Sequence, residues 1–208
     1  MFRRQIEVLG EENQKKLSQK SILIVGCGGL GNIIATTLGC IGLNKIYLID
    51  FDKIELHNIH RQFQFCKNDI GKFKCEVLKE KIQRCDTEII SLNKKFSTDL
   101  DIDIDLIIDA TDNFDVRLEI DRFAKKKNIP WIYSSVEEWR AQIGIFKKAS
   151  FEIFALKNHT PKGQIPPMVN LAGSFAALVA LKVLLFDINE KIFYLDFENN
   201  LVFKEFSL

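Results

Sequence analysis

The sequence predicts an α/β fold: a Rossmann-like, doubly wound, mostly parallel sheet that continues into a C-terminal, mostly antiparallel extension. Short apolar runs rich in β-branched residues alternate with longer segments of helical periodicity, which is the pattern of a parallel sheet. A glycine-rich turn separates the first such run from the first long helical segment. After Trp139 the pattern changes, and short apolar runs follow one another more directly. We therefore expect a single domain over residues 1–208.

Residues 21–135 are predicted to form the nucleotide-binding part of this domain. The first apolar run, Ser21–Val25, is continuous and β-branched, which suits a strand buried on both faces of a sheet. The same reasoning predicts strands at 21–25, 45–50, 87–92, 105–109 and 129–134, and helices at 30–41, 70–85 and 116–127. Residues 1–20 are expected to form an amphipathic helical arm with a turn at Gly10.

Residues 136–208 are predicted to form the antiparallel extension. Strands are expected at 142–146, 151–155, 191–197 and 201–206, and the last two should form a hairpin around Glu198-Asn199-Asn200. An apolar stretch at 171–186 contains Lys182, so we expect a buried helix there. Trp139 is expected in the core, and the alternative is that it lines a peptide-binding groove.

The composition argues against several classes of protein. Lys and Arg number 29 against 28 acidic residues, and the resulting net charge of +1 predicts no nucleic-acid-binding surface. Apolar residues make up 47% of the chain, which is enough to bury a core and argues against disorder. The charged N-terminus argues against a signal peptide, and no apolar run reaches the roughly 18 residues of a membrane span. We expect a cytoplasmic protein that binds neither nucleic acid nor membrane.

The chain has five cysteines, all in its first half: Cys27, Cys40, Cys66, Cys75 and Cys85. None of them forms a C-x-x-C pair. Because nothing indicates a secretory context, we expect reduced thiols rather than a disulfide framework. We also expect no zinc site, since no set of zinc ligands with the usual spacing is present.

A glycine-rich turn follows the first predicted strand. The segment Gly26-Cys27-Gly28-Gly29-Leu30-Gly31 matches G-x-G-x-x-G at a junction between strand and helix. Glycines at this spacing allow a tight turn and a close approach to phosphate, and the helix N-terminus attracts an anion. Asp50, at the end of the second strand, is placed to accept hydrogen bonds from a ribose. This motif alone does not separate an ATP site from a dinucleotide site or from a turn without a ligand.

Charged residues downstream of the glycine turn favour ATP over a nicotinamide cofactor. Nucleotidyl transfer builds negative charge on the leaving pyrophosphate, which arginine, lysine or a metal must stabilise, whereas hydride transfer does not. Arg61 and Lys74 are candidates for contacts to the phosphates. Asp52 and Asp112 are candidates for holding Mg²⁺, which suits one or two carboxylates together with phosphate oxygens.

Four segments occur in the order IVGCGGLGN, YLIDFDKIELHNIHRQF, DIGKFKCE and IIDATDNFDVR, between Ser21 and Arg117. Together they resemble the MoeB/ThiF/HesA family of ubiquitin-activating-enzyme-like adenylyltransferases, and in particular its ThiF-like members. Arg4-Gln5-Ile6 resembles an element that precedes the first strand in bacterial members, and residues 172–182 resemble their closing helix. The resemblance therefore covers nearly the whole chain.

The resemblance implies roles for particular residues. Asp50 binds the adenosine ribose, Arg61 and Lys74 contact phosphate, and Asp112 lies at the Mg²⁺–ATP site. Family members are typically homodimers in which an N-terminal arginine reaches the partner's active site, and Arg4 is the matching position. Catalytic roles are thus implied for Arg4, Arg61, Lys74 and Asp112. The implied nucleotide-binding residues are Gly26, Gly28, Gly29, Gly31, Asp50, Asp52, His57, Asn58, Arg61, Gln62, Lys74, Asp112 and Asn113.

The implied reaction uses a small ubiquitin-like sulfur carrier protein that ends in Gly-Gly. Its C-terminal glycine carboxylate attacks the α-phosphate of ATP, giving an acyl-adenylate and pyrophosphate. Because the carboxylate is already a nucleophile, positioning and charge stabilisation could supply the catalysis without a general base. Residues 136–208 would bind the carrier. A ThiS-like carrier of thiamine thiazole biosynthesis is favoured, and a MoaD-like molybdopterin carrier is the alternative.

Other functions remain open at this point. An NAD-dependent oxidoreductase would share the glycine turn, but it would not need the set of Arg61, Lys74 and Asp112. A nucleotide-binding protein of this family that has lost catalysis is a second alternative. A dehydratase acting on modified tRNA shares the fold, and the balanced charge and the N-terminal Arg-Gln element disfavour it.

The sequence departs from the family in its cysteines. Many relatives bind zinc through two C-x-x-C pairs in the C-terminal half, whereas this chain has no cysteine after Cys85. ThiF-like and ubiquitin-activating members carry a cysteine in a crossover loop, and His159 lies near that place here. Ala141-Gln142 stands where many relatives have Gly-Gln. We expect adenylation without zinc, and we assign no persulfide or thioester step.

Overall fold

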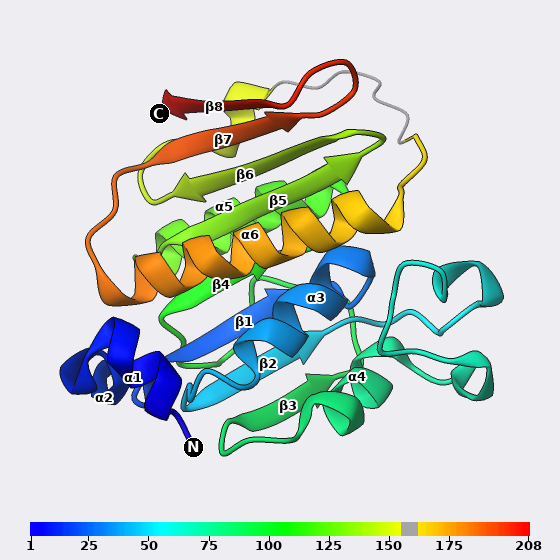
Figure 1. The fold of residues 1–208 in the computed structure, drawn as a ribbon, viewed down its shortest axis with the longest axis horizontal. Helices are drawn as coiled ribbons and strands as arrows, with labels where there is room; N and C mark the ends of the chain where they lie inside the picture. The colour runs from blue at the N-terminus through cyan, green and yellow to red at the C-terminus, as the bar shows by residue number, and fades with distance from the viewer. Residues whose placement is uncertain (155–161) are drawn as a thin grey trace.

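The computed structural model describes residues 1–154 and 162–208 and contains an eight-stranded sheet, ordered β3-β2-β1-β4-β5-β6-β7-β8 (Figure 1). The strands are β1 (Ser21–Val25), β2 (Lys45–Ile49), β3 (Glu88–Leu92), β4 (Leu106–Asp109), β5 (Trp131–Glu137), β6 (Arg140–Phe146), β7 (Lys191–Asp196) and β8 (Val202–Ser207). Strands β1 to β5 pair in parallel, and β6, β7 and β8 add antiparallel pairs. The predicted fold class is confirmed.

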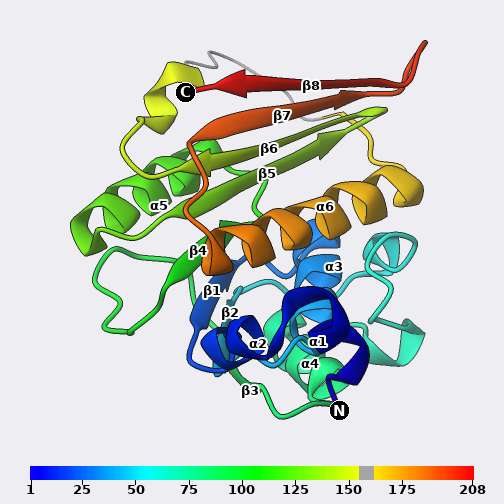
Figure 2. The same cartoon turned by 60° about the vertical axis from the view of Figure 1, so that its left-hand side comes forward.

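Helices cover both faces of the sheet. They are α1 (Arg3–Leu9), α2 (Glu11–Leu17), α3 (Gly29–Leu38), α4 (Lys74–Ile82), α5 (Phe114–Lys127) and α6 (Pro166–Leu185), with short 3-10 helices η1 (Leu56–Asn58), η2 (Lys67–Asp69) and η3 (Phe151–Phe154). Helices α3, α4 and α6 lie on one face, and α5 lies on the other (Figures 1 and 2). The arm formed by α1 and α2 packs beside α3 and α6 at the end where the parallel strands begin.

Strand β1 explains why the core has two halves. Ile22 and Ile24 point to the side of α3 and α6, whereas Leu23 and Val25 point to the side of α5. All five residues of β1 are buried, as expected for a continuous β-branched run. The sheet is therefore the shared wall of two apolar layers.

Helix α6 is longer than the sequence predicts, because it begins at Pro166 rather than at 171. With 20 residues and a mean hydropathy of 1.9, it is long and apolar enough to cross a membrane by length and composition alone. Half of that stretch is buried in the protein, where Gly173 lies against Ile33 of α3. This packing is that of a core helix.

An aromatic cluster replaces one predicted strand. Residues Phe151–Phe154 form η3 instead of a strand, and Ala155 lies outside the described residues. Phe151 and Phe154 point to the same side and contact the Tyr133 ring with centroid distances of 5.1 and 5.5 Å. One helical turn brings both rings onto the sheet, which alternating strand geometry would prevent.

Two further expectations are wrong. Trp139 is 49% exposed, because it lies in the two-residue turn between β5 and β6, where Glu137 pairs with Arg140. Cys40 and Cys85 form a disulfide across a Cα–Cα distance of 5.4 Å, although reduced thiols were expected. The two cysteines follow α3 and α4, and the packing of these helices brings them together although 45 residues separate them.

Candidate active site

A cavity of about 590 Å³ lies at the carboxyl ends of the parallel strands. It lies where the order of the strands in the sheet reverses. Strand β1 pairs with β2 on one side, where the sheet continues to β3, and with β4 on the other side, where it continues to β5. Ligands of open α/β sheets bind at this kind of position. The cavity wall includes every residue predicted to bind nucleotide except Gly31.

The glycine turn forms the floor of the cavity. Gly26 has a φ of +95°, and a Cβ there would lie 2.7 Å from the carbonyl oxygen of Ala110. Gly29 opens α3, and a Cβ there would lie 2.9 Å from Val169 of α6. At Gly28, in contrast, a Cβ would meet only Gln62, at 3.8 Å. Gly26 and Gly29 are therefore required by packing, and Gly28 leaves the N-terminal end of α3 open to the cavity.

Asp50 locks the glycine turn to the end of β2. Its carboxylate accepts hydrogen bonds from the backbone N–H of Cys27 at 2.6 Å and of Asp52 at 2.7 Å. Burial raises the pKa of Asp50, and these two hydrogen bonds oppose the rise. The carboxylate lines the cavity, so it can both hold the turn and face a ligand.

Lys74 lies at the first position of α4, with its side chain 9% exposed. Its ammonium group donates to Asp52 at 2.8 Å, and its backbone N–H donates to the carbonyl oxygen of Asp52 at 2.9 Å. Asp52 is half exposed, whereas Lys74 is buried, and both residues line the cavity. The predicted helix at 70–85 begins only at Lys74, since Gly71 has a φ of +87° and Phe73 bridges to Lys53.

Arg61 is positioned by two acceptors. Its Nε donates to Gln164 Oε1 at 3.0 Å, and its Nη1 donates to the carbonyl oxygen of His57 at 3.0 Å. Nearby, Asn58 is buried and accepts the backbone N–H of Glu55 at 2.9 Å. The segment from His57 to Arg61 is thus a hydrogen-bonded turn along the cavity wall.

Gln62 is 2% exposed and lines the cavity. Among the described residues, its Oε1 has no hydrogen-bond partner. An orphaned acceptor at this depth is costly unless a ligand or water satisfies it. The observation marks this wall of the cavity as a place for a polar ligand.

Asp112 and Asn113 lie at the start of α5. Asn113 is the N-cap, and its Oδ1 accepts the backbone N–H of Val116 at 3.1 Å. Asp112 is exposed in the cavity wall. Within the described residues, no three His, Cys, Asp or Glu side chains group closely enough to hold a metal ion. A carboxylate of this kind suits Mg²⁺ that arrives with phosphate oxygens, and the expected lack of zinc stays a prediction.

The sequence analysis missed a buried ion pair beneath Asp112. Asp109 is fully buried at the end of β4, and Arg117 of α5 donates to it at 2.9 Å. Asp109 also accepts the backbone N–H and the hydroxyl of Thr111, while Arg117 donates to the carbonyl oxygen of Thr111. Burial raises the pKa of Asp109, and the Arg117 charge opposes the rise. The available signal was an aspartate ending an apolar strand, eight residues before an arginine in a helix.

Two predicted residues lie elsewhere. Gly31 packs against Gly26 within the glycine turn, where a Cβ would collide with the backbone. Arg4 lies on α1 with 93% of its side chain exposed and pairs with Glu7 at 3.2 Å. Helix α1 is at the end of the molecule where the parallel strands begin, opposite the glycine turn (Figure 1). Arg4 therefore does not reach the cavity of its own chain.

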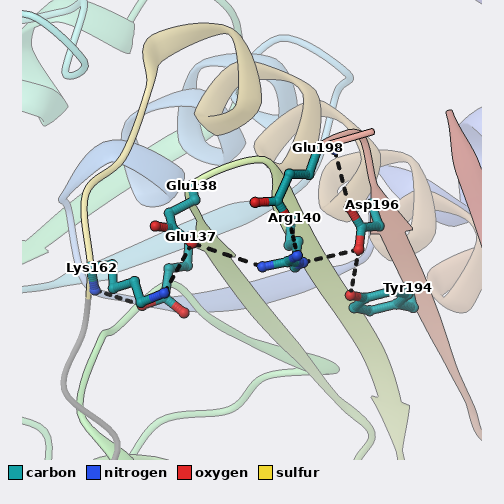
Figure 3. Close-up of polar contacts among 7 residues, drawn as sticks. All are labelled: Glu137, Glu138, Arg140, Lys162, Tyr194, Asp196 and Glu198. Carbon is teal, nitrogen blue, oxygen red and sulfur yellow. Dashed lines mark hydrogen bonds and ion pairs between the residues drawn. The ribbon is translucent and has the colours of Figure 1, made fainter. Parts of the chain in front are cut away.

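A charged network holds the β5–β6 turn at the mouth of the cavity (Figure 3). Glu138 has a φ of +52°, which is uncommon for a residue with a side chain. Its carboxylate lies 3.3 Å from Lys162 and 3.8 Å from Arg140, and Arg140 donates to Asp196 at 2.9 Å. Trp139, the second residue of this turn, is exposed. His159, the position near the family's crossover cysteine, lies outside the described residues.

The chain matches the profile of a known protein family and resembles several known proteins. The ThiF family profile matches residues 2–207. The sulfur carrier protein ThiS adenylyltransferase of Escherichia coli is 28% identical over 189 residues, which cover 83% of this chain and 75% of that protein. The adenylyltransferase and sulfurtransferase MOCS3 of Caenorhabditis briggsae is 28% identical over 196 residues, 86% of this chain. The chain spans about half the length of that protein, 49%.

Solved structures share the fold. A crystal structure of E. coli MccB superimposes with a TM-score of 0.83 at 20% identity and covers 99% of this chain. The chain covers 69% of that MccB structure. At this identity the likeness concerns the fold alone.

Proposed function

Since the chain belongs to the ThiF family, we propose that it is an ATP-dependent adenylyltransferase that activates the C-terminal carboxylate of a ubiquitin-like sulfur carrier protein. One observation carries this proposal. The cavity collects, from four separate segments, a glycine turn, two cations and a carboxylate, represented by Gly28, Arg61, Lys74 and Asp112. An enzyme that transfers a nucleotidyl group needs these groups around the phosphates.

Each group has a part in the proposed reaction. The open end of α3 at Gly28 would receive the phosphates, and Asp50 would accept hydrogen bonds from the ribose. Arg61 and Lys74 would stabilise the charge that develops on pyrophosphate. Asp112 would hold Mg²⁺, which supplies further charge stabilisation when it is bound with ATP. The carrier carboxylate is itself the nucleophile, so positioning supplies the remaining catalysis.

The carrier would approach over the antiparallel extension, residues 136–208. The β5–β6 turn, which holds the exposed Trp139, belongs to this extension, and Glu137 and Lys162 of the charged network around the turn line the cavity (Figure 3). We favour a ThiS-like carrier, and a MoaD-like carrier is the alternative. Relatives of both kinds match the chain: the ThiS adenylyltransferase of E. coli and a molybdopterin-synthase adenylyltransferase of Haemophilus influenzae at 27% identity.

Isotope exchange between ATP and pyrophosphate tests the proposal. With a carrier ending in Gly-Gly, the wild type should catalyse exchange, and Asp112→Ala should abolish it while circular dichroism shows an intact fold. Lys74→Ala should lose about 3 kcal/mol of transition-state stabilisation, the order found for one preorganised electrostatic group. A carrier lacking the Gly-Gly end is the matched control. Exchange that survives Asp112→Ala would refute the assignment of this cavity.

Nucleotide choice is a second test. ATP with Mg²⁺ should raise the melting temperature, because a ligand that binds only the folded state stabilises it by mass action. NAD should have a smaller effect at the same concentration. Stabilisation by NAD at concentrations below those needed for ATP would favour the oxidoreductase alternative.

A further inference from the structure

Arg61 is held by a residue that belongs to none of the motifs around the nucleotide site. Its Nε donates to Oε1 of Gln164, which is 103 residues away in the chain, at 3.0 Å. Gln164 comes just before α6, and both side chains line the cavity. The contact therefore depends on the tertiary fold.

Gln164 is itself anchored on the other side. Its Nε2 donates to the carbonyl oxygen of Val136 at 3.4 Å, at the end of β5. Its backbone forms an isolated parallel bridge with Glu138, whose N–H donates to Gly163 at 2.8 Å. Because the amide nitrogen faces a carbonyl group, the amide oxygen must face Arg61. The orientation of the Gln164 side chain is thus set by the sheet.

We propose that Gln164 is a positioning residue, which orients the guanidinium of Arg61 towards the phosphates of bound nucleotide. This inference rests on the proposed function. A guanidinium has five N–H donors. Gln164 takes the Nε donor of Arg61 and the His57 carbonyl takes one at Nη1, and the remaining donors meet no acceptor among residues 1–154 and 162–208, so they can face a ligand.

The rigid plane of the guanidinium makes this orientation matter. Two N–H groups on one edge can contact two phosphate oxygens, but only when the plane is turned correctly. Without Gln164, the described contacts of Arg61 reduce to the single hydrogen bond with His57. The side chain would then rotate among rotamers, and nucleotide binding would have to order it.

A double-mutant cycle on ATP binding tests the inference. Gln164→Leu removes the amide at similar volume and should raise the Kd for Mg²⁺–ATP about tenfold, as expected for one hydrogen bond to a charged group. Arg61→Ala should weaken binding more. The double variant should bind no more weakly than Arg61→Ala, because Gln164 acts only through Arg61. Gln19→Leu, at an exposed site after α2, is the matched control and should bind like the wild type.

The outcomes separate this inference from the proposed function. Calorimetry measures binding in all variants, and exchange assays show whether kcat falls as well. Additive effects of Gln164→Leu and Arg61→Ala, or an unchanged Kd in Gln164→Leu, would overturn the positioning role. A wild type that binds ATP but gives no carrier-dependent exchange would refute only the proposed function, and the binding cycle would still decide the role of Gln164. A wild type that binds no ATP would refute both.

Discussion

Replacing Arg117 with methionine should destabilise the protein strongly. The change keeps much of the side-chain volume but removes the cation that lies 2.9 Å from the fully buried Asp109. Removing one partner of a buried ion pair typically costs about 3–5 kcal/mol, because the other charge stays buried and uncompensated. The backbone N–H and hydroxyl of Thr111 still donate to Asp109, so we expect a loss of about 3 kcal/mol.

The loss should grow with pH. Burial raises the pKa of Asp109 and Arg117 opposes the rise, so the pKa should lie higher still in Arg117→Met. Between the ordinary aspartate pKa of about 3.9 and this raised value, the folded variant binds a proton that the unfolded chain lacks. Stability in this window falls as pH rises, so the variant should lose more at pH 8 than at pH 5.

Urea unfolding of wild type and variant at both pH values measures the effect. The matched control is the double variant Asp109→Asn/Arg117→Met, which removes the buried charge as well and should recover part of the stability at pH 8. An equal loss at pH 5 and pH 8, or a double variant less stable than Arg117→Met, would refute the reasoning. Either result would mean that Asp109 is not an uncompensated charge in the variant.

Two further predictions concern the disulfide and the exposed tryptophan. Cys40–Cys85 spans 45 residues, so chain-entropy arithmetic gives about 4 kcal/mol of stabilisation. Dithiothreitol should lower the melting temperature of the wild type but not that of Cys40→Ser/Cys85→Ser; an unaffected wild type would contradict the bond. Trp139→Ala should raise the KM for the carrier about tenfold and leave ATP affinity unchanged, with Trp139→Phe in between, since truncating an interface tryptophan commonly costs more than 1 kcal/mol. An unchanged KM would place Trp139 outside the carrier surface.

Most helices and strands could be predicted, because the apolar pattern of each one lies within a single segment of the sequence. In Ser21–Val25 four apolar residues follow Ser21 without a break, which suits a strand buried on both faces, and the structure buries all five residues. The prediction failed where neighbours decide the conformation. The segment beginning at Phe151 has strand-like composition, yet its rings reach Tyr133 only from a helical turn. Trp139 resembles a core residue in sequence, and its place in a two-residue turn exposes it.

The candidate site divides in the same way. Arg61, Lys74 and Asp112 lie in short motifs with defined spacing, and all three line the cavity. Asp109 and Gln164 were missed, because each matters through a partner on another element. No pattern within one segment indicates that Gln164 meets Arg61 across 103 residues. Such contacts follow from strand order and helix packing. The sequence predicts the fold class, but it does not predict which side chains on different elements meet.

Arg4 provides the last prediction, which concerns assembly. Its side chain is 93% exposed on α1, at the end of the molecule opposite the glycine turn (Figure 1). If Arg4 acts in catalysis, as its place in the N-terminal Arg-Gln element suggests, it must act on the cavity of a second copy in a homodimer. Arg4→Ala and Asp112→Ala should then each be inactive alone. In a mixed dimer, the site with an intact Asp112 receives Arg4 from the other chain.

Random exchange of the two variants makes half of the dimers mixed, and each mixed dimer has one complete site of two. Recovery should therefore approach about a quarter of wild-type exchange activity for a two-fold dimer. Differently tagged chains report the fraction of mixed dimers and so serve as the control for subunit exchange. Mixed dimers without recovered activity would remove Arg4 from the catalytic set. Recovery would show that the isolated chain lacks one catalytic residue, because the active site is completed by a partner.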